Sequence, residues 1–190
     1  LAERPDVIAL SLHVDYWDYL GWRDVYAQPA FSRRQMGYRD AAGARSVYTP
    51  QIVVDGVAAV IGSRREKVMA AVEAALARPD AVTLELERAA DGVRATLVPA
   101  PGARPPAAPA VVWFVTFRTP DPLTIERGEN AGKRFQYRNV ARSWMKMGHW
   151  DGAGPARFDA PAPSEDAGVA VIVQAGPVGP ILGAAKLEPR

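Results

Sequence analysis

The sequence predicts an α+β protein, with a mixed first part over residues 1–80 and a β-rich, β-sandwich-like second part over residues 81–190. In the first part, an apolar run typical of a buried strand is followed by segments with apolar residues at helical spacing. From Ala81 onward, short alternating runs are separated by turn signals, which is typical of a small sandwich or barrel. The boundary between the parts falls near Arg78-Pro79-Asp80, where the helical pattern ends.

The first part contains five predicted elements. Residues 6–14 are apolar at nearly every position, as expected for a strand that is covered on both faces. A helix is predicted from Pro29 to about residue 42, with Gly43 as its stop. Strands at 51–54 and 57–61 flank Asp55-Gly56, a strong signal for a two-residue hairpin turn. Ser63 and Glu66 fit a capping box at the start of a helix that runs to about residue 78.

The second part is predicted to be made of strands. Residues 82–87 alternate apolar and polar side chains, Asp91-Gly92 turns the chain, and residues 93–98 return. A stiff Pro/Ala-rich connector over residues 99–109 precedes a strongly apolar strand at 111–117. Residues 135–150 fit either a helix or a strand, and we favour a strand with an irregular end. Further strands are expected at 123–126, 169–174 and 181–187.

Composition narrows the class of protein. With 190 residues, of which 48% are apolar, the chain can bury a sizeable core. A formal net charge of +2 gives no reason to propose nucleic acid as a partner. No apolar run approaches the roughly 20 residues that a membrane-spanning helix needs. There is no G-x-S-x-G elbow, P-loop or H-E-x-x-H motif, so nothing specifies a hydrolase or an NTPase.

The sequence contains no cysteine. Disulfides, zinc–thiolate sites and cysteine nucleophiles are therefore excluded within the residues shown. As given, the chain cannot carry out thiol–disulfide chemistry itself, and no catalytic residue, metal or cofactor is predicted.

Thr49-Pro50 is the most informative short element. A proline directly before a buried strand and hairpin is a place where a cis peptide bond can be used, although an ordinary trans proline at a strand start is the alternative. The order that follows it, strand, hairpin and helix, matches the end of the thioredoxin fold, in which such a loop offers backbone hydrogen bonds to an extended substrate. We therefore predict a cis bond, with Thr49 and Pro50 as substrate-binding residues.

Five aromatic residues follow the first predicted strand: Tyr16, Trp17, Tyr19, Trp22 and Tyr26. They could form a ligand-binding or partner surface, where Trp and Tyr are enriched, or they could pack between the two parts of the chain. We favour packing for the cluster as a whole. Tyr16, Trp17 and Trp22 are the candidates for substrate contact.

His13 and Asp15 lie two residues apart, so they share one face if the strand continues. They could act as a proton-transfer pair or as part of a metal site. The interpretation we favour is structural, with His13 hydrogen-bonded at the strand end and Asp15 capping a turn.

Several segments together resemble one bacterial family. They are HVDYWDYLGW (13–22), VYTPQ (47–51), GEN (128–130) with YRNV (137–140), and GPILGAA (179–185). The chain is similar along nearly its whole length to domain of unknown function 1223. The resemblance implies a thioredoxin-like first domain, a β-rich second domain and export to the periplasm. It also implies an upstream strand and helix with a C-x-x-C-type motif, neither of which is present. The chain is then either a fragment whose thioredoxin-like domain (1–80) lacks its first strand and helix, or a variant without redox residues, and we favour the fragment.

Our leading hypothesis is that the intact protein is an exported, periplasmic or secreted, thioredoxin-like protein that acts in thiol–disulfide exchange or in an allied redox role. Its nucleophile would be a low-pKa cysteine upstream of residue 1, and Thr49 and Pro50 would position a partner polypeptide. The alternative is a non-catalytic binding module or accessory subunit that uses the aromatic residues and the β-rich part as an interface. In both cases the expected partner is a protein or peptide.

Overall fold

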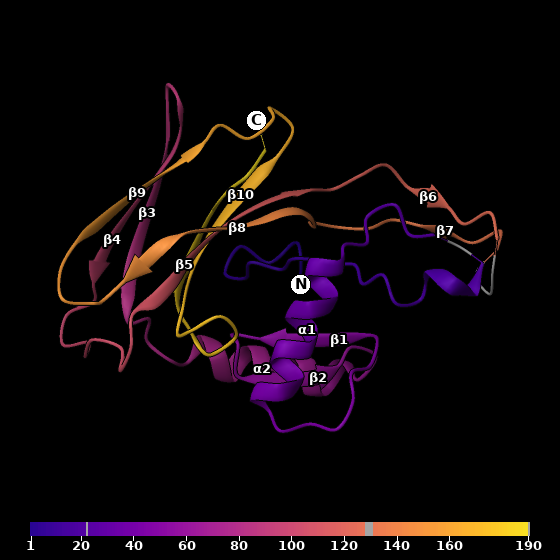
Figure 1. Cartoon of the computed structure of the whole chain (residues 1–190), viewed down its shortest axis with the longest axis horizontal. Coiled ribbons are helices and arrows are strands. Elements are labelled where there is room, and N and C mark those ends of the chain that lie inside the picture. The colour runs from indigo at the N-terminus through magenta and orange to yellow at the C-terminus, as the bar shows by residue number, and fades with distance from the viewer. Residues whose placement is uncertain (22, 128–130, 190) are drawn as a thin grey trace.

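The computed structural model describes residues 1–21, 23–127 and 131–189 (Figure 1). Within these residues the chain forms eleven β-strands in four separate antiparallel sheets, together with two α-helices and one short 3-10 helix. Neither α-helix is long and apolar enough to cross a membrane, a statement that covers only the described residues.

Two sheets make up most of the second half of the chain. The larger has the order β11-β10-β5-β8, and the smaller has the order β3-β4-β9. The larger sheet is formed by β5 (Ala110–Arg118), β8 (Val140–Trp150), β10 (Gly168–Gln174) and β11 (Ile181–Leu187), and the smaller by β3 (Val82–Ala89), β4 (Gly92–Pro99) and β9 (Ala156–Pro161). Figure 1 shows both sheets on the same side of the molecule. Their facing side chains share one apolar core.

Strand β10 explains how the larger sheet is covered on both faces. All seven of its residues are buried. Val169, Val171 and Val173 enter the core shared with the smaller sheet, whereas Ala170 and Ile172 point into a second cluster. Successive side chains of a strand point to opposite faces, so a strand with apolar residues at every position must be covered twice.

The second apolar cluster joins the first part of the chain to the larger sheet. Phe31, on α1 (Pro29–Ala41), is 2% exposed and packs there with Phe117. Ile8, Leu10 and Leu12 also pack against this cluster. The outer face of the larger sheet is therefore covered by one helix and by an extended N-terminal segment.

A small hairpin unit follows α1. Strands β1 (Gln51–Val54) and β2 (Ala58–Ile61) pair with Val54 opposite Ala58, so the loop between them has three residues, Asp55, Gly56 and Val57, instead of the predicted two. Asp55 and Gly56 have positive φ angles, 53° and 69°, and the Val57 N–H donates to the Val54 carbonyl at 3.0 Å, as in a type I′ turn. Helix α2 (Arg65–Leu76) packs beside the hairpin. The other two-stranded sheet lies on an arm away from the main sheets (Figure 1). It is formed by β6 (Leu123–Thr124) and β7 (Arg134–Phe135).

The predicted fold class, a partial thioredoxin-like domain followed by a β-sandwich-like domain, is wrong. The chain is a β-rich protein with several antiparallel sheets, and β1–β2 stands as a two-stranded sheet within the described residues. Residues 6–14 form no strand and make a single parallel bridge, between Ser11 and Val140. The apolar pattern of this segment indicated packing rather than a strand: Leu10 and Leu12 are partly buried against the larger sheet, and such packing does not require strand pairing. The division near residue 80 stays a prediction.

Most other elements match their predictions. The hairpin at β1–β2, both helices and the strands at 82–87, 93–98, 111–117, 169–174 and 181–187 are confirmed. Residues 140–150 form strand β8, so the helical alternative for this stretch is wrong. The capping box is also wrong: α2 takes Arg64 as its N-cap with no side-chain hydrogen bond, because the helix begins one residue later than Ser63 as N-cap would allow.

Candidate functional site

The aromatic segment, residues 15–21 and 23–26, lies between α1 and the loop that precedes β1. It contains the 3-10 helix Asp18–Leu20 and ends that helix at Gly21, whose φ of 96° favours glycine. Its first anchor is a pair of hydrogen bonds to α1. The Ser32 hydroxyl donates to Asp15 Oδ1 at 2.5 Å and accepts from the Asp15 N–H at 3.2 Å. Ser32 is 5% exposed, so this anchor sits in the interior.

A second anchor runs through one glutamine of α1. The Tyr16 hydroxyl donates to Gln35 Oε1 at 2.7 Å. Gln35 Nε2 in turn donates to the Tyr48 carbonyl at 2.9 Å and to Gln51 Oε1 at 3.1 Å. Burial raises the pKa of Tyr16 above its usual value, so this phenol stays protonated as a donor. The glutamine thus ties the aromatic segment to the start of β1.

The third anchor brings the predicted binding residues together. The Trp17 indole N–H donates to Thr49 Oγ1 at 3.0 Å. The Thr49–Pro50 peptide bond is cis, as predicted. Pro50 lies against the end of β2, since its carbonyl accepts from the Gly62 N–H at 2.8 Å. Tyr16, Trp17, Thr49 and Pro50 therefore form one continuous region.

The outer side of the aromatic segment is exposed and apolar. Trp17 is 44% exposed, Tyr19 77% and Leu20 51%. The rings of Trp17 and Tyr19 are stacked, with centroids 6.4 Å apart and an interplanar angle of 28°. Trp22, the remaining candidate for substrate contact, lies outside the described residues. The packing role that we favoured for the cluster thus applies to Tyr16 and Tyr26, whereas Trp17 and Tyr19 face solvent.

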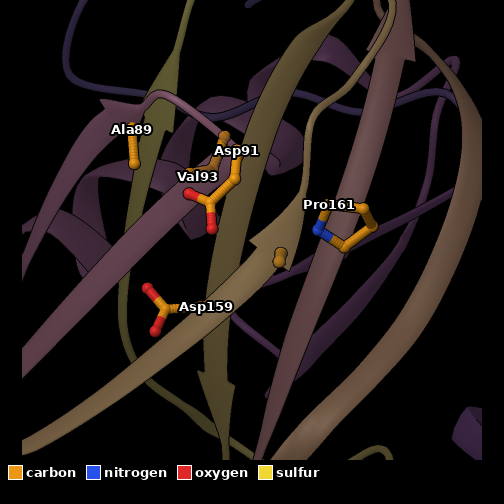
Figure 2. Close-up of a pocket in the computed structure, with 6 residues that line it drawn as sticks. Ala89, Asp91, Val93, Asp159 and Pro161 are labelled. Atoms are coloured by element: carbon orange, nitrogen blue, oxygen red, sulfur yellow. The ribbon is translucent and has the colours of Figure 1, made fainter.

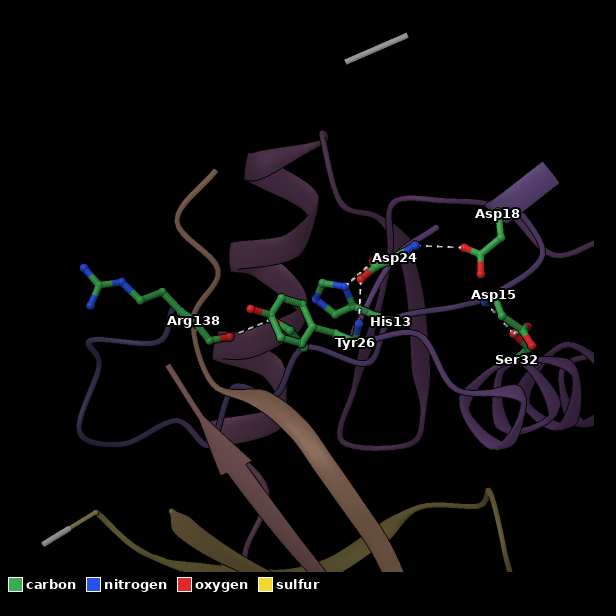
Figure 3. Close-up of polar contacts among 8 residues, drawn as sticks. His13, Asp15, Asp18, Asp24, Tyr26, Ser32 and Arg138 are labelled. Carbon is green, nitrogen blue, oxygen red and sulfur yellow. Dashed lines mark hydrogen bonds and ion pairs between the residues drawn. The ribbon is translucent and has the colours of Figure 1, made fainter. Parts of the chain in front are cut away.

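A largely buried histidine lies next to the start of the segment (Figure 3). His13 Nδ1 lies 2.6 Å from Asp24 Oδ2, and the His13 side chain is only 10% exposed. Two rings, Tyr26 and Tyr137, make edge contacts with the imidazole at centroid distances of 5.5 and 4.7 Å. Tyr137 follows the β6–β7 arm, so this contact holds the arm against the aromatic segment.

His13 and Asp15 do not form a pair. His13 contacts Asp24, and Asp15 contacts Ser32, as Figure 3 shows. These contacts support a structural role for both residues rather than a proton-transfer pair. In the described parts of the chain, no group of three or more His, Cys, Asp or Glu side chains is placed to hold a metal ion.

Asp24, Ser32 and Gln35 are site residues that sequence reasoning missed. Asp24 stands eleven positions after His13 in a loop, where no periodic pattern relates the two. Gln35 lies one turn after Ser32 on α1, so the helical spacing of Ser32 and Gln35 was the available signal.

Asp24 gives the segment a pH dependence. Burial alone would raise the pKa of Asp24, but hydrogen bonds from His13 and from the Tyr26 N–H outweigh it and hold this pKa below its usual value. A carboxyl with a depressed pKa stabilises the fold above its unfolded-state pKa of about 3.9, and that contribution is lost as pH falls through the folded value.

We therefore expect the wild-type protein to lose more stability than Asp24→Asn when the pH is lowered from about 5 to about 3. Urea unfolding followed by tryptophan fluorescence at both pH values measures the difference. Asp121→Asn, at an exposed carboxylate, is the control and should behave like the wild type. Equal acid sensitivity of wild type and Asp24→Asn would contradict the assignment.

Two surface pockets lie outside the aromatic segment. The first, of about 220 Å³, is lined by residues of β9 and of the β3–β4 hairpin, including Asp91 and Asp159 (Figure 2). Its Asp159 carboxylate already accepts from Arg94 Nε at 2.8 Å. Asp91 is therefore the carboxylate of this pocket that is not already paired with a basic side chain of the described residues. No residue of the aromatic segment lines the pocket.

The second pocket adjoins the region around Thr49. It has a volume of about 280 Å³ and is lined by Tyr48, Ala59, Val60, Ile61, Arg64 and Lys67. Arg64 and Lys67 are exposed and form no ion pair with any described residue. The two basic side chains therefore give this pocket a net positive charge.

The fold and the site define a β-rich protein with an anchored, exposed aromatic segment. A family model described as protein of unknown function (DUF1223) matches residues 1–174, and the chain belongs to this family. A crystal structure of an Agrobacterium tumefaciens protein, determined in a structural genomics programme, is similar, with 28% sequence identity and a TM-score of 0.79. The similarity covers 97% of this chain and 81% of that chain. No curated protein matches the chain.

Proposed function

We propose that this chain is a binding module that holds a protein or peptide partner on the exposed face of the aromatic segment, beside Thr49 and Pro50. The observation that carries the proposal is the state of Trp17. Its indole N–H is fixed on Thr49 Oγ1, while its ring is 44% exposed and stacked on the still more exposed Tyr19.

The anchoring favours binding over chance exposure. Tryptophan and tyrosine contribute most to interface energies, and an aromatic ring held in place before association loses less conformational entropy on binding. Three side-chain hydrogen-bond anchors, at Asp15, Tyr16 and Trp17, hold the segment on α1 and on the loop before β1. The exposed rings are thus presented by a fixed backbone.

The test is selection of random linear peptides displayed on phage, with the wild-type chain as bait. We expect the enriched peptides, once synthesised, to bind Trp17→Ala at least about 30-fold more weakly, which is the effect of losing a residue worth about 2 kcal/mol. Tyr19→Ala should also weaken binding. Isothermal titration calorimetry provides the measurement.

Val98→Ala is the matched control, since Val98 is 41% exposed on β4 and outside the aromatic segment. It should bind the selected peptides like the wild type. Failure to enrich any peptide over a Trp17→Ala/Tyr19→Ala bait, or equal affinity of Trp17→Ala and wild type, would overturn the proposal.

Thiol–disulfide exchange by a longer form of the protein is a second proposal. It is supported by the family resemblance and by the exposure of Thr49 and Pro50, and it requires cysteines that the 190 residues do not contain. An insulin-reduction assay on the product of the complete gene tests it. Absence of turnover would reject it while leaving the binding role intact.

Export to the periplasm is proposed on the same resemblance. Fractionation of cells that express the complete gene with a C-terminal tag tests this location. Recovery of the protein with the cytoplasmic markers would reject it.

A further inference from the structure

We propose that the partner segment is an acidic, extended peptide that adds as a strand to the outer edge of β2 and places a carboxylate between Arg64 and Lys67. This inference rests on the proposed binding function and names the chemistry of its ligand.

The second pocket continues the aromatic surface. Tyr48 lines this pocket, and the next residue, Thr49, holds Trp17. Pro50 closes the gap to β2, because a Cβ placed on Gly62 would lie 3.1 Å from Pro50 Cβ. A ligand that contacts Trp17 can therefore extend along one uninterrupted surface to Ile61.

Strand β2 is an edge strand with backbone groups that face outward. Its only partner among the described residues is β1. The Gly62 N–H donates to the Pro50 carbonyl, so position 62 points its backbone toward β1, and by alternation so do positions 60 and 58. Ala59 N–H, Ala59 C=O and Ile61 N–H then point away from β1.

Ala59 and Ile61, the residues that carry these outward groups, both line the pocket. The Ile61 carbonyl is already occupied by the Arg64 N–H at 2.9 Å. An extended peptide can use the free groups as in other cases of strand addition to a sheet edge, where backbone bonds give affinity and alternate side chains give specificity.

The charge of the pocket selects an acidic ligand. Arg64 and Lys67 line it, and no acidic side chain does. Neither cation forms an ion pair with a described residue. A carboxylate on the ligand would make charge-assisted hydrogen bonds there, whereas a lysine at the same position would be repelled.

The probes are three capped, fluorescein-labelled peptides in which valine alternates with glutamate, glutamine or lysine. Fluorescence anisotropy should show the glutamate peptide binding the wild-type chain about tenfold more tightly than the glutamine peptide, with the lysine peptide weaker still. The preference should disappear in Arg64→Gln/Lys67→Gln. Arg65→Gln, an exposed cation one position away that does not line the pocket, is the matched control and should retain it.

Backbone methylation tests strand addition without changing the protein. N-methylation of all valines and N-methylation of all glutamates block opposite edges of the same peptide. One of the two methylated peptides should lose at least tenfold in affinity, and the other should bind like the parent. Equal binding of both methylated peptides would overturn strand addition.

These experiments can reject the acidic ligand or strand addition without rejecting the proposed binding function. Binding that is lost in Trp17→Ala, but is equal for the glutamate and glutamine peptides, overturns the acidic ligand alone. A glutamate preference that persists in Arg64→Gln/Lys67→Gln does the same. If no alternating peptide binds while the phage-selected peptides do, strand addition is rejected and the aromatic surface stands.

Discussion

Phe31→Ala is expected to destabilise the protein by about 3–5 kcal/mol, the usual cost of removing a buried aromatic ring. Phe31 is 2% exposed and joins α1 to the cluster formed by Phe117 and other residues of the larger sheet. The surrounding backbone belongs to a sheet that is packed on both faces, so it can collapse only partly into the space left by the ring.

The same substitution should loosen the candidate site, because Ser32 and Gln35 lie on α1 next to Phe31. Urea denaturation gives the loss of unfolding free energy, and hydrogen exchange of the aromatic segment gives the local effect. Arg33→Ala, at an exposed position of the same helix, should change stability by less than about 0.5 kcal/mol. A loss below about 1 kcal/mol for Phe31→Ala would show that α1 does not depend on this contact.

Local signals in the sequence predicted local structure well. The Asp55-Gly56 turn, the alternating residues of β3 and the apolar run of β10 each indicate an element through its own side chains. The cis bond at Thr49–Pro50 was also predicted, from the order of the elements after it. Each of these features depends on residues close together in the chain.

The fold class could not be predicted in the same way, because it depends on which strands pair. Residues 6–14 are apolar at most positions and β10 is apolar at all but its last, yet β10 pairs with two strands while the N-terminal segment makes one bridge. Periodicity reports that a segment is buried and does not report its hydrogen-bond partners. The thioredoxin-like prediction placed residues 6–14 in a sheet that does not form.

The sequence indicated several residues of the candidate site but not the hydrogen bonds that hold them together. Tyr16, Trp17, Thr49 and Pro50 were singled out, and they do lie together. Asp15 was assigned to a turn rather than to Ser32, and Asp24 was not considered as the partner of His13. The first contact joins a loop residue to α1 and the second joins two loop residues, and neither separation along the chain carries a periodic signal.

A second large effect is expected at Arg34, whose guanidinium is enclosed between α1 and the larger sheet. It lies over the Trp144 ring at 4.0 Å from the centroid and 5.4 Å from that of Trp113. Arg34 Nη2 donates to Gln174 Oε1 at 2.7 Å, and Nη1 donates to the Pro177 carbonyl at 2.9 Å. Burial lowers the pKa of Arg34, and its recorded partners are neutral oxygens and aromatic rings.

Arg34→Ala should therefore cost about 3 kcal/mol or more. Gln174 is fully buried, and without the guanidinium its amide oxygen has no donor, which carries a penalty of about 1–3 kcal/mol in addition to the lost packing. The indole N–H groups of Trp113 and Trp144 have no hydrogen-bond partner among the described residues, so both rings depend on packing and on the cation above them.

Arg34→Met separates these contributions. Methionine refills much of the volume and also removes the cost of burying a charge, so its loss of stability should be clearly smaller than that of alanine. Urea unfolding measures both variants, and the tryptophan emission maximum reports the change beside Trp113 and Trp144. Arg39→Ala, whose guanidinium pairs with exposed Asp40 and with no other described side chain, is the control. If alanine and methionine were equally destabilising, the polar contacts of Arg34 would account for the whole effect and its packing between α1 and the sheet for none.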